Sequence, residues 1–228
     1  MALPDSAITA LKGGLVVSCQ APAESPLHNP LVIAAMAEAS VQRGAVGVRI
    51  DSPDHIQAVR SRVTVPIIGL WKQVLPGSDV YITPQFHHAQ AVAAAGADII
   101  AVDATERTRP GGETLANLIS RIHGELGKPV MADIDTLASA QAAAAAGADC
   151  IGTTLYGYTQ ATQAFTPPGF ELLETMVKTF DIPCICEGGI AAPNEARQSL
   201  DIGAYAVVVG TAITGIDKLV ENYRAALG

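Results

Sequence analysis

One short phrase recurs four times along the chain at nearly even spacing: a glycine ends a helical stretch and an apolar strand follows at once. The four copies begin at Gly44, Gly96, Gly147 and Gly203, at intervals of 52, 51 and 56 residues. Glycine suits the end of a helix because the chain must turn through positive φ there. An interval of this length holds two strand-plus-helix units, so the four phrases together predict eight such units.

Apolar strands that alternate with amphipathic helices predict a parallel sheet covered by helices. Eight units in 228 residues fit a single (β/α)8 barrel spanning residues 1–228, with an open doubly wound sheet as the alternative. Strands are expected at 15–19, 46–50, 67–72, 98–103, 130–133, 149–153, 183–187 and 205–209. Helices are expected at 30–43, 53–61, 85–95, 113–126, 137–146, 170–179, 194–200 and 216–227. Such a barrel carries its chemistry on the loops at the strand C-termini.

The composition excludes several classes of protein. Hydrophobic residues are 49% and charged residues 16%, the balance of a well-buried globular protein and the opposite of a disordered one. The net charge of −8, with no run of lysines and arginines, argues against nucleic acid and anionic membranes as partners. No uncharged stretch is long enough to cross a bilayer, so we expect a cytoplasmic protein. Buried, reduced thiols are expected at Cys19, Cys150, Cys184 and Cys186.

Polar side chains stand at the C-terminal ends of most predicted strands, where they would converge on one mouth. They are Gln20, Arg49, Lys72, Asp103, Asp133, Thr153, Thr154 and Glu187. Lys72 follows an apolar run, and a lysine kept from water can act as a base or form a Schiff base. A carboxylate such as Glu187 at the end of a buried strand is costly unless it is paired or functional. Together they would suit moving a proton on a carbon beside a carbonyl.

Glycines after the last two strands point to a phosphate site. Gly188 and Gly189 follow the seventh strand, and Gly210 and Thr211 follow the eighth. Barrels often hold phosphate at these two loops through backbone N–H groups at the start of a helix. The alternative is that both segments are tight turns that need glycine.

The remaining polar residues give weaker signals. His87 and His88 are adjacent at the start of a predicted helix and are expected at the surface. His28 follows the first strand, and it fits a site residue and a surface residue equally well. Arg107 and Arg109 fit either a substrate clamp or a solvated loop.

With these residues in view, the sequence resembles the N-acetylmannosamine-6-phosphate 2-epimerase family over nearly the whole chain. The matching segments are residues 17–21, 66–69, 81–84, 103–105, 131–134, 186–188 and 209–214. The resemblance implies a (β/α)8 epimerase of bacterial sialic-acid breakdown. Such enzymes interconvert N-acetylmannosamine 6-phosphate and N-acetylglucosamine 6-phosphate without a cofactor or metal, and the resemblance suggests a homodimer.

The resemblance also implies roles for individual residues. Lys72 matches the catalytic lysine and Glu187 its partner carboxylate. Substrate-binding positions are matched by Gln20, Arg49 and Asp133, to which we add Thr153, and phosphate-binding positions by Gly188, Gly210 and Thr211, to which we add Gly189. The family usually has arginine where this chain has Gly215, and Lys218 is the nearest candidate to replace it.

Three functions remain open from the residues themselves. The first is an isomerase in which Lys72 removes the C2 proton and Glu187 either donates the second proton or tunes Lys72. The second is an aldolase that forms a Schiff base through Lys72. The third is a sugar-phosphate-binding barrel without turnover; a phosphoribosyl isomerase shares the barrel but not the segments around Gln20 and Lys72.

Overall fold

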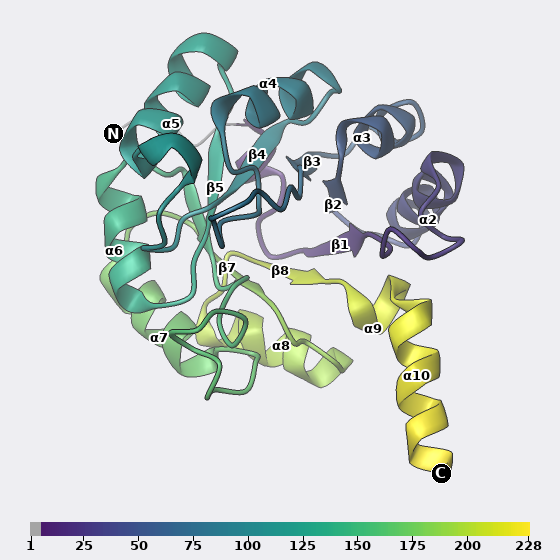
Figure 1. Ribbon diagram of the computed structural model, residues 1–228. Helices are drawn as coiled ribbons and strands as arrows, with labels where there is room; N and C mark the ends of the chain where they lie inside the picture. Colours follow the sequence, from purple (N-terminus) through teal and green to yellow (C-terminus); the bar gives the residue numbers. More distant parts are fainter. Residues whose placement is uncertain (1–5) are drawn as a thin grey trace.

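The computed structural model describes residues 6–228, which form a closed barrel of eight parallel strands in sequence order (Figure 1). The strands are β1 (Leu15–Cys19), β2 (Gly47–Asp51), β3 (Ile67–Leu70), β4 (Ile99–Asp103), β5 (Val130–Asp133), β6 (Cys150–Gly152), β7 (Cys184–Glu187) and β8 (Ala206–Val209). Because β1 pairs with both β2 and β8, the sheet has no free edge. The expected barrel is therefore confirmed and the open sheet is excluded.

Helices cover the outside of the barrel, and each expected helix and strand lies within two residues of its expected bounds. The longer helices are α2 (Pro30–Gln42), α3 (Pro53–Arg60), α4 (Phe86–Ala94), α5 (Leu115–Arg121) with its π-helical extension η2 (Ile122–Leu126), α6 (Leu137–Ala145), α7 (Phe170–Thr179), α8 (Pro193–Ile202) and α10 (Ile216–Leu227). Three short elements were not expected: α1 (Ser6–Thr9), η1 (Pro110–Gly112) and α9 (Thr211–Thr214).

The recurring glycine phrase ends α2, α4, α6 and α8 in the same way. The four glycines have φ of 98°, 106°, 92° and 111°, values that residues with a Cβ atom rarely adopt. At the first copy, the Gly44 N–H donates to the Val41 carbonyl and the Ala45 N–H reaches back to Ser40, the two bonds of a Schellman motif.

The same phrase sets the register of the strand that follows. In each copy, the backbone N–H of the residue two positions after the glycine donates to the preceding strand of the barrel. The Asp98 N–H, for example, donates to the carbonyl of Ile67. The Asp98 carboxylate also accepts the Ile67 N–H at 2.9 Å, and Asp149 accepts the Val130 N–H at 2.7 Å. Each phrase thus stops a helix and registers an even-numbered strand on the odd-numbered strand before it.

Two apolar layers surround the sheet. The outer layer fills the space between strands and helices, and the inner layer fills the barrel with side chains such as Val16, Leu70 and Ile99. Ile8 and Leu11 join the inner layer from the N-terminal segment and are at most 1% exposed. They close the end of the barrel at which the strands begin, which leaves the opposite end for a site.

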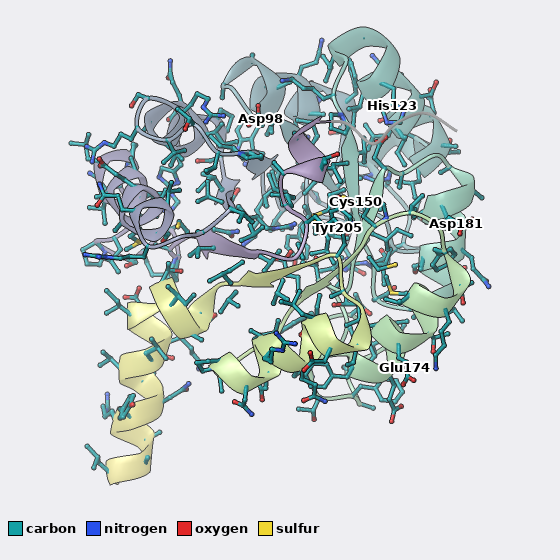
Figure 2. All side chains as sticks on the ribbon, turned by 180° about the vertical axis from the view of Figure 1, so that it is seen from behind. Asp98, His123, Cys150, Glu174, Asp181 and Tyr205 are labelled. Carbon is teal, nitrogen blue, oxygen red and sulfur yellow. The ribbon has the colours of Figure 1, made fainter. Side chains whose placement is uncertain are left out.

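The cysteines are free and buried, as expected, and Cys150 lies inside the barrel near the centre of Figure 2. Burial raises the pKa of the Cys19 thiol to about 12 and that of Cys184 to about 11, so these thiols stay protonated. Within residues 6–228, no helix has the length and apolar character needed to cross a membrane.

Helix α10 departs from the barrel pattern because it projects away from the sheet instead of covering it (Figure 1). None of its residues is buried, and its apolar side chains Ile216, Val220, Tyr223 and Leu227 are 51–87% exposed. Next to its base, an apolar groove of about 390 Å³ opens between β1, β8 and α8.

Candidate functional site

A buried ion cluster lies inside the mouth of the barrel at the C-terminal ends of the strands. Arg49 of β2 is 1% exposed, and its Nη1 and Nη2 donate to the two carboxylate oxygens of Asp133 at 3.1 and 2.6 Å. Its Nε lies 3.1 Å from Oε1 of Glu187 on β7, without hydrogen-bond geometry. One guanidinium therefore faces two carboxylates, and the cluster carries excess negative charge.

The buried position of Glu187 in this cluster changes its protonation. Burial raises the pKa of Glu187 to about 7; Arg49 opposes the rise and the charge of Asp133 adds to it. The side chain of Glu187 is 12% exposed and lines the cavity, so a bound molecule can reach it. A carboxyl group that titrates near neutrality can give or take a proton at physiological pH.

Two consecutive threonines after β6 hold Glu187 in different ways. The Thr153 hydroxyl is buried; it accepts the Glu187 N–H at 3.0 Å and donates to the Glu187 carbonyl at 2.9 Å. Thr153 therefore fixes the backbone of Glu187, and the residue that lines the cavity is Thr154. The Thr154 hydroxyl lies 2.6 Å from Asp133 Oδ1 and 3.2 Å from Glu187 Oε2.

Lys72 lies two residues beyond the end of β3, where the chain turns back and pairs with Ile82. Its Nζ donates to Oε1 of Gln20 at 2.5 Å and lies 3.9 Å from Oδ2 of Asp51. The side chain is 44% exposed, so the amine lies at the surface of the cavity rather than in the apolar environment that the sequence indicated. Gln20 is itself oriented by Ser18, whose Oγ accepts its Nε2 at 2.9 Å.

Asp51 is a site residue that the sequence analysis missed. Its Oδ1 accepts the backbone N–H of Lys72 at 2.9 Å, which fixes the start of the loop that carries the amine. The sequence places this carboxylate two residues after Arg49, on the same strand. The predicted strand, 46–50, ended one residue too early to include it.

The cavity at this mouth has two adjoining lobes of about 600 and 610 Å³. Lys72, Gln20 and Thr211 line both lobes. One lobe extends to Arg49, Tyr81, Thr154 and Glu187, and the other extends to His28, Asp51 and Trp71. The lysine and glutamate predicted from sequence therefore face one space that is large enough for a sugar phosphate.

The four residues expected to hold phosphate all line the lobe that contains Glu187. Gly188 and Gly189 have φ of 103° and 71°, and a Cβ at Gly189 would lie 2.4 Å from Pro167. Gly210 precedes α9, whose first residue is Thr211. The turn geometry requires glycine, and it brings the backbone to the cavity surface.

Gly215 allows no side chain in this conformation, because a Cβ there would lie 2.8 Å from the Cα of Thr211. Lys218, on the first turn of α10, lines both lobes and brings a cation to this end of the cavity. The start of α10 is held by a hydrogen bond of 2.9 Å from the Ser25 hydroxyl to Asp217.

Two histidine expectations have different outcomes. His88 is buried and packs edge-on against Trp71, so the expectation that it lies at the surface is wrong; burial lowers its pKa to about 4. Helix α4 turns one of the two adjacent histidines inward, which leaves His87 exposed. His28 lines the cavity, and its Nδ1 lies 3.0 Å from the carbonyl of Ala21.

Arg107 and Arg109 are tied to the protein rather than solvated. Arg107 pairs with the buried Asp103 at 2.6 Å, and Arg109 is buried with its Nη1 on the carbonyl of Pro84. Neither arginine lines the two lobes. In the part of the chain that the structure describes, no group of three or more His, Cys, Asp or Glu side chains is arranged to hold a metal ion.

Sequence comparisons point to a family. Residues 33–228 match the family described as "Putative N-acetylmannosamine-6-phosphate epimerase". A protein from Synechococcus elongatus is 63% identical over 219 residues, which cover 95% of this chain and 94% of the relative. One from Thermosynechococcus vestitus is 64% identical, with coverage of 96% and 95%, and one from Cutibacterium acnes is 46% identical, with coverage of 98% and 97%. All three are named "Putative N-acetylmannosamine-6-phosphate 2-epimerase".

Structural comparisons agree. A solved structure described as the N-acetylmannosamine-6-phosphate 2-epimerase from Clostridium perfringens superposes with a TM-score of 0.93 at 38% identity, covering 99% of this chain and 98% of that one. A thiamine phosphate pyrophosphorylase from Pyrococcus furiosus superposes with a TM-score of 0.60 at 17% identity. The second likeness shows the fold alone.

Proposed function

Since the chain belongs to the N-acetylmannosamine-6-phosphate epimerase family, we propose that it interconverts N-acetylmannosamine 6-phosphate and N-acetylglucosamine 6-phosphate. The observation that supports this most is that Lys72 and Glu187, from opposite parts of the barrel, line one lobe of the cavity. The two sugars differ only in the configuration at C2, so the reaction needs one proton removed and one returned on the other face.

The sugar reacts in its open-chain form, in which C2 lies beside the aldehyde carbonyl. Lys72 removes the C2 proton, and the electron pair of that C–H bond moves to the carbonyl oxygen as an enolate. Glu187 then gives its proton to the opposite face of C2, and the carbonyl is restored with C2 inverted. The reverse reaction uses the same two groups with exchanged roles, so the pair must hold one proton between them in either direction.

The other polar residues position these groups and stabilise charge. Gln20 accepts a hydrogen bond from the Lys72 amine and sets its direction. Arg49, fixed by Asp133, supplies a preorganised positive charge beside Glu187, where negative charge develops as the proton leaves. The phosphate lies against Gly188, Gly189, Gly210 and Thr211, with Lys218 as the nearby cation.

Turnover of N-acetylmannosamine 6-phosphate by the purified protein tests this function. Lys72→Ala is expected to lower kcat by at least roughly 10²–10⁴, the usual contribution of a positioned acid–base group. Lys178→Ala is the matched control, because Lys178 is exposed on α7 and pairs with Glu174 of the same helix. Full activity in the Lys72 variant would remove the lysine from the mechanism.

Treatment with borohydride distinguishes a Schiff-base aldolase from the proposed proton transfer. Reduction in the presence of substrate traps a Schiff base as a covalent adduct on the lysine, whereas proton transfer leaves no adduct. We expect the mass of the protein to be unchanged after borohydride treatment. A substrate-dependent mass increase located at Lys72 would favour the aldolase.

We propose further that the protein is a homodimer in which α10 of each copy lies in the apolar groove of the other. The groove is lined by Leu15, Val207 and Val209, on the outer face of β1 and β8 that the last helix of a barrel usually covers. The apolar side of α10 is uncovered and begins beside this groove. Mutual exchange of the helix would bury both apolar surfaces in one step.

A further inference from the structure

The Thr154 hydroxyl lies between the two carboxyl groups of the ion cluster. We propose that Thr154 is a positioning residue whose single hydrogen turns from Asp133 to Glu187 whenever Glu187 loses its proton. The proposal rests on the proposed function for its meaning in the reaction, but the contact itself belongs to the free protein.

The geometry requires a choice between two acceptors. A threonine hydroxyl has one hydrogen to donate and lone pairs with which to accept. Asp133 Oδ1 at 2.6 Å and Glu187 Oε2 at 3.2 Å both lie within hydrogen-bond distance of it. The shorter distance is that of a hydroxyl donating to a carboxylate, which assigns the hydrogen to Asp133. A lone pair of Thr154 then faces Glu187, ready to accept from a protonated carboxyl.

Rotation of the Thr154 hydroxyl provides a hydrogen bond to Glu187 when Glu187 is ionised. When Glu187 gives its proton to C2, its Oε2 becomes an acceptor, and the Thr154 hydrogen can turn to it. Asp133 keeps both bonds from the Arg49 guanidinium throughout. The hydroxyl keeps its own hydrogen, so the proton that moves is the one shared between Glu187 and the substrate.

The surroundings of Glu187 offer no substitute for this hydroxyl. The charged or titratable groups that face its carboxyl are Arg49, Asp133, Lys72 and Tyr158. Arg49 approaches Oε1 with its Nε out of hydrogen-bond alignment. Among residues 6–228, Thr154 is the side chain that hydrogen-bonds the Glu187 carboxyl, and it does so at Oε2.

Thr154→Val tests the proposal because it removes the hydroxyl and keeps the shape of the side chain. The first measurement is a ¹³C NMR titration of glutamate carboxyl groups in the free protein, with Glu187→Gln identifying the Glu187 signal. We expect the midpoint of Glu187 to move to lower pH in Thr154→Val, because the protonated state loses two hydrogen bonds (Thr154 to Asp133 and Glu187 to Thr154) and the ionised state loses one. Thr154→Ser is expected to restore the parent midpoint, and Thr175→Val on the surface of α7 to leave it unchanged.

The second measurement is kinetic. In Thr154→Val, kcat is expected to fall about ten- to a hundredfold, as for loss of a hydrogen bond to a charged group, with little change in KM. The acid limb of the pH profile should follow the new midpoint, and Thr154→Ser should recover both. An unmoved or raised Glu187 midpoint in Thr154→Val would overturn the proposal. A parent protein without turnover would instead overturn the proposed function, and the titration would still decide the role of Thr154.

Discussion

The guanidinium of Arg49 is shared between two carboxylates, and this sharing determines both the stability and the chemistry of the mouth. Asp133 takes the bidentate pair and Glu187 is left beside the Nε. The bidentate pair with Asp133 holds the buried guanidinium of Arg49 in place. The position beside the Nε leaves Glu187 with a pKa that rises to about 7, because burial outweighs the attraction of Arg49.

Loss of Asp133 leaves this buried cation with poor compensation. Asp133→Ala is expected to lower the free energy of unfolding by about 3–5 kcal/mol, measured by urea denaturation. Glu174→Ala is the control, since Glu174 lies on the exposed side of α7 (Figure 2) and its pair with Lys178 is screened by solvent and contributes little. Equal effects of the two substitutions would contradict the buried pair as the anchor of the site.

The pKa of Glu187 predicts the pH dependence of turnover. Below pH 7 the Glu187 carboxyl gains a proton in addition to the single proton that the pair must hold for catalysis. We expect kcat/KM to fall about tenfold per pH unit below pH 7 in both reaction directions, with the same midpoint. Glu187→Gln should be inactive at every pH. An acid limb with its midpoint near 4 would show that Glu187 is an ordinary carboxylate.

At the scale of elements, the glycine phrase made the barrel predictable because helix ends and strand starts are local features. Longer-range contacts were not. The sequence after β3 predicts a continued strand, but β3 ends at Leu70 and Lys72 forms an isolated antiparallel bridge with Ile82. The roles of Asp51 and Thr154 depend on partners from other strands, and no local pattern marks them.

Replacing glycine by alanine is expected to have opposite effects on stability at a helix end and inside a helix. Gly147 has a φ of 92°, so Gly147→Ala is expected to destabilise the protein by roughly 1–2 kcal/mol although no atom would clash. Gly124 lies within η2 and also has free space, so Gly124→Ala is expected to stabilise it by about 0.5–1 kcal/mol. Urea unfolding of both variants checks the pair, and stabilisation by Gly147→Ala would contradict the helix-end role.

At the scale of the whole molecule, α10 is the element that one copy of the chain leaves unpartnered. Val220→Asp puts a charge on its apolar side and is expected to shift a dimer to monomers in sedimentation velocity. Val74→Asp is the control, because Val74 is 88% exposed and belongs to the loop after β3 instead of α10. A parent protein that stays monomeric at every concentration measured would contradict the exchanged dimer.

Proton NMR in D₂O shows whether Lys72 and Glu187 move the proton at C2. With N-acetylmannosamine 6-phosphate as substrate, we expect N-acetylglucosamine 6-phosphate to accumulate with deuterium at C2. Lys72→Ala should show neither product nor exchange. Epimerisation that keeps the original hydrogen at C2 throughout, or exchange that survives in Lys72→Ala, would contradict proton transfer by these two residues.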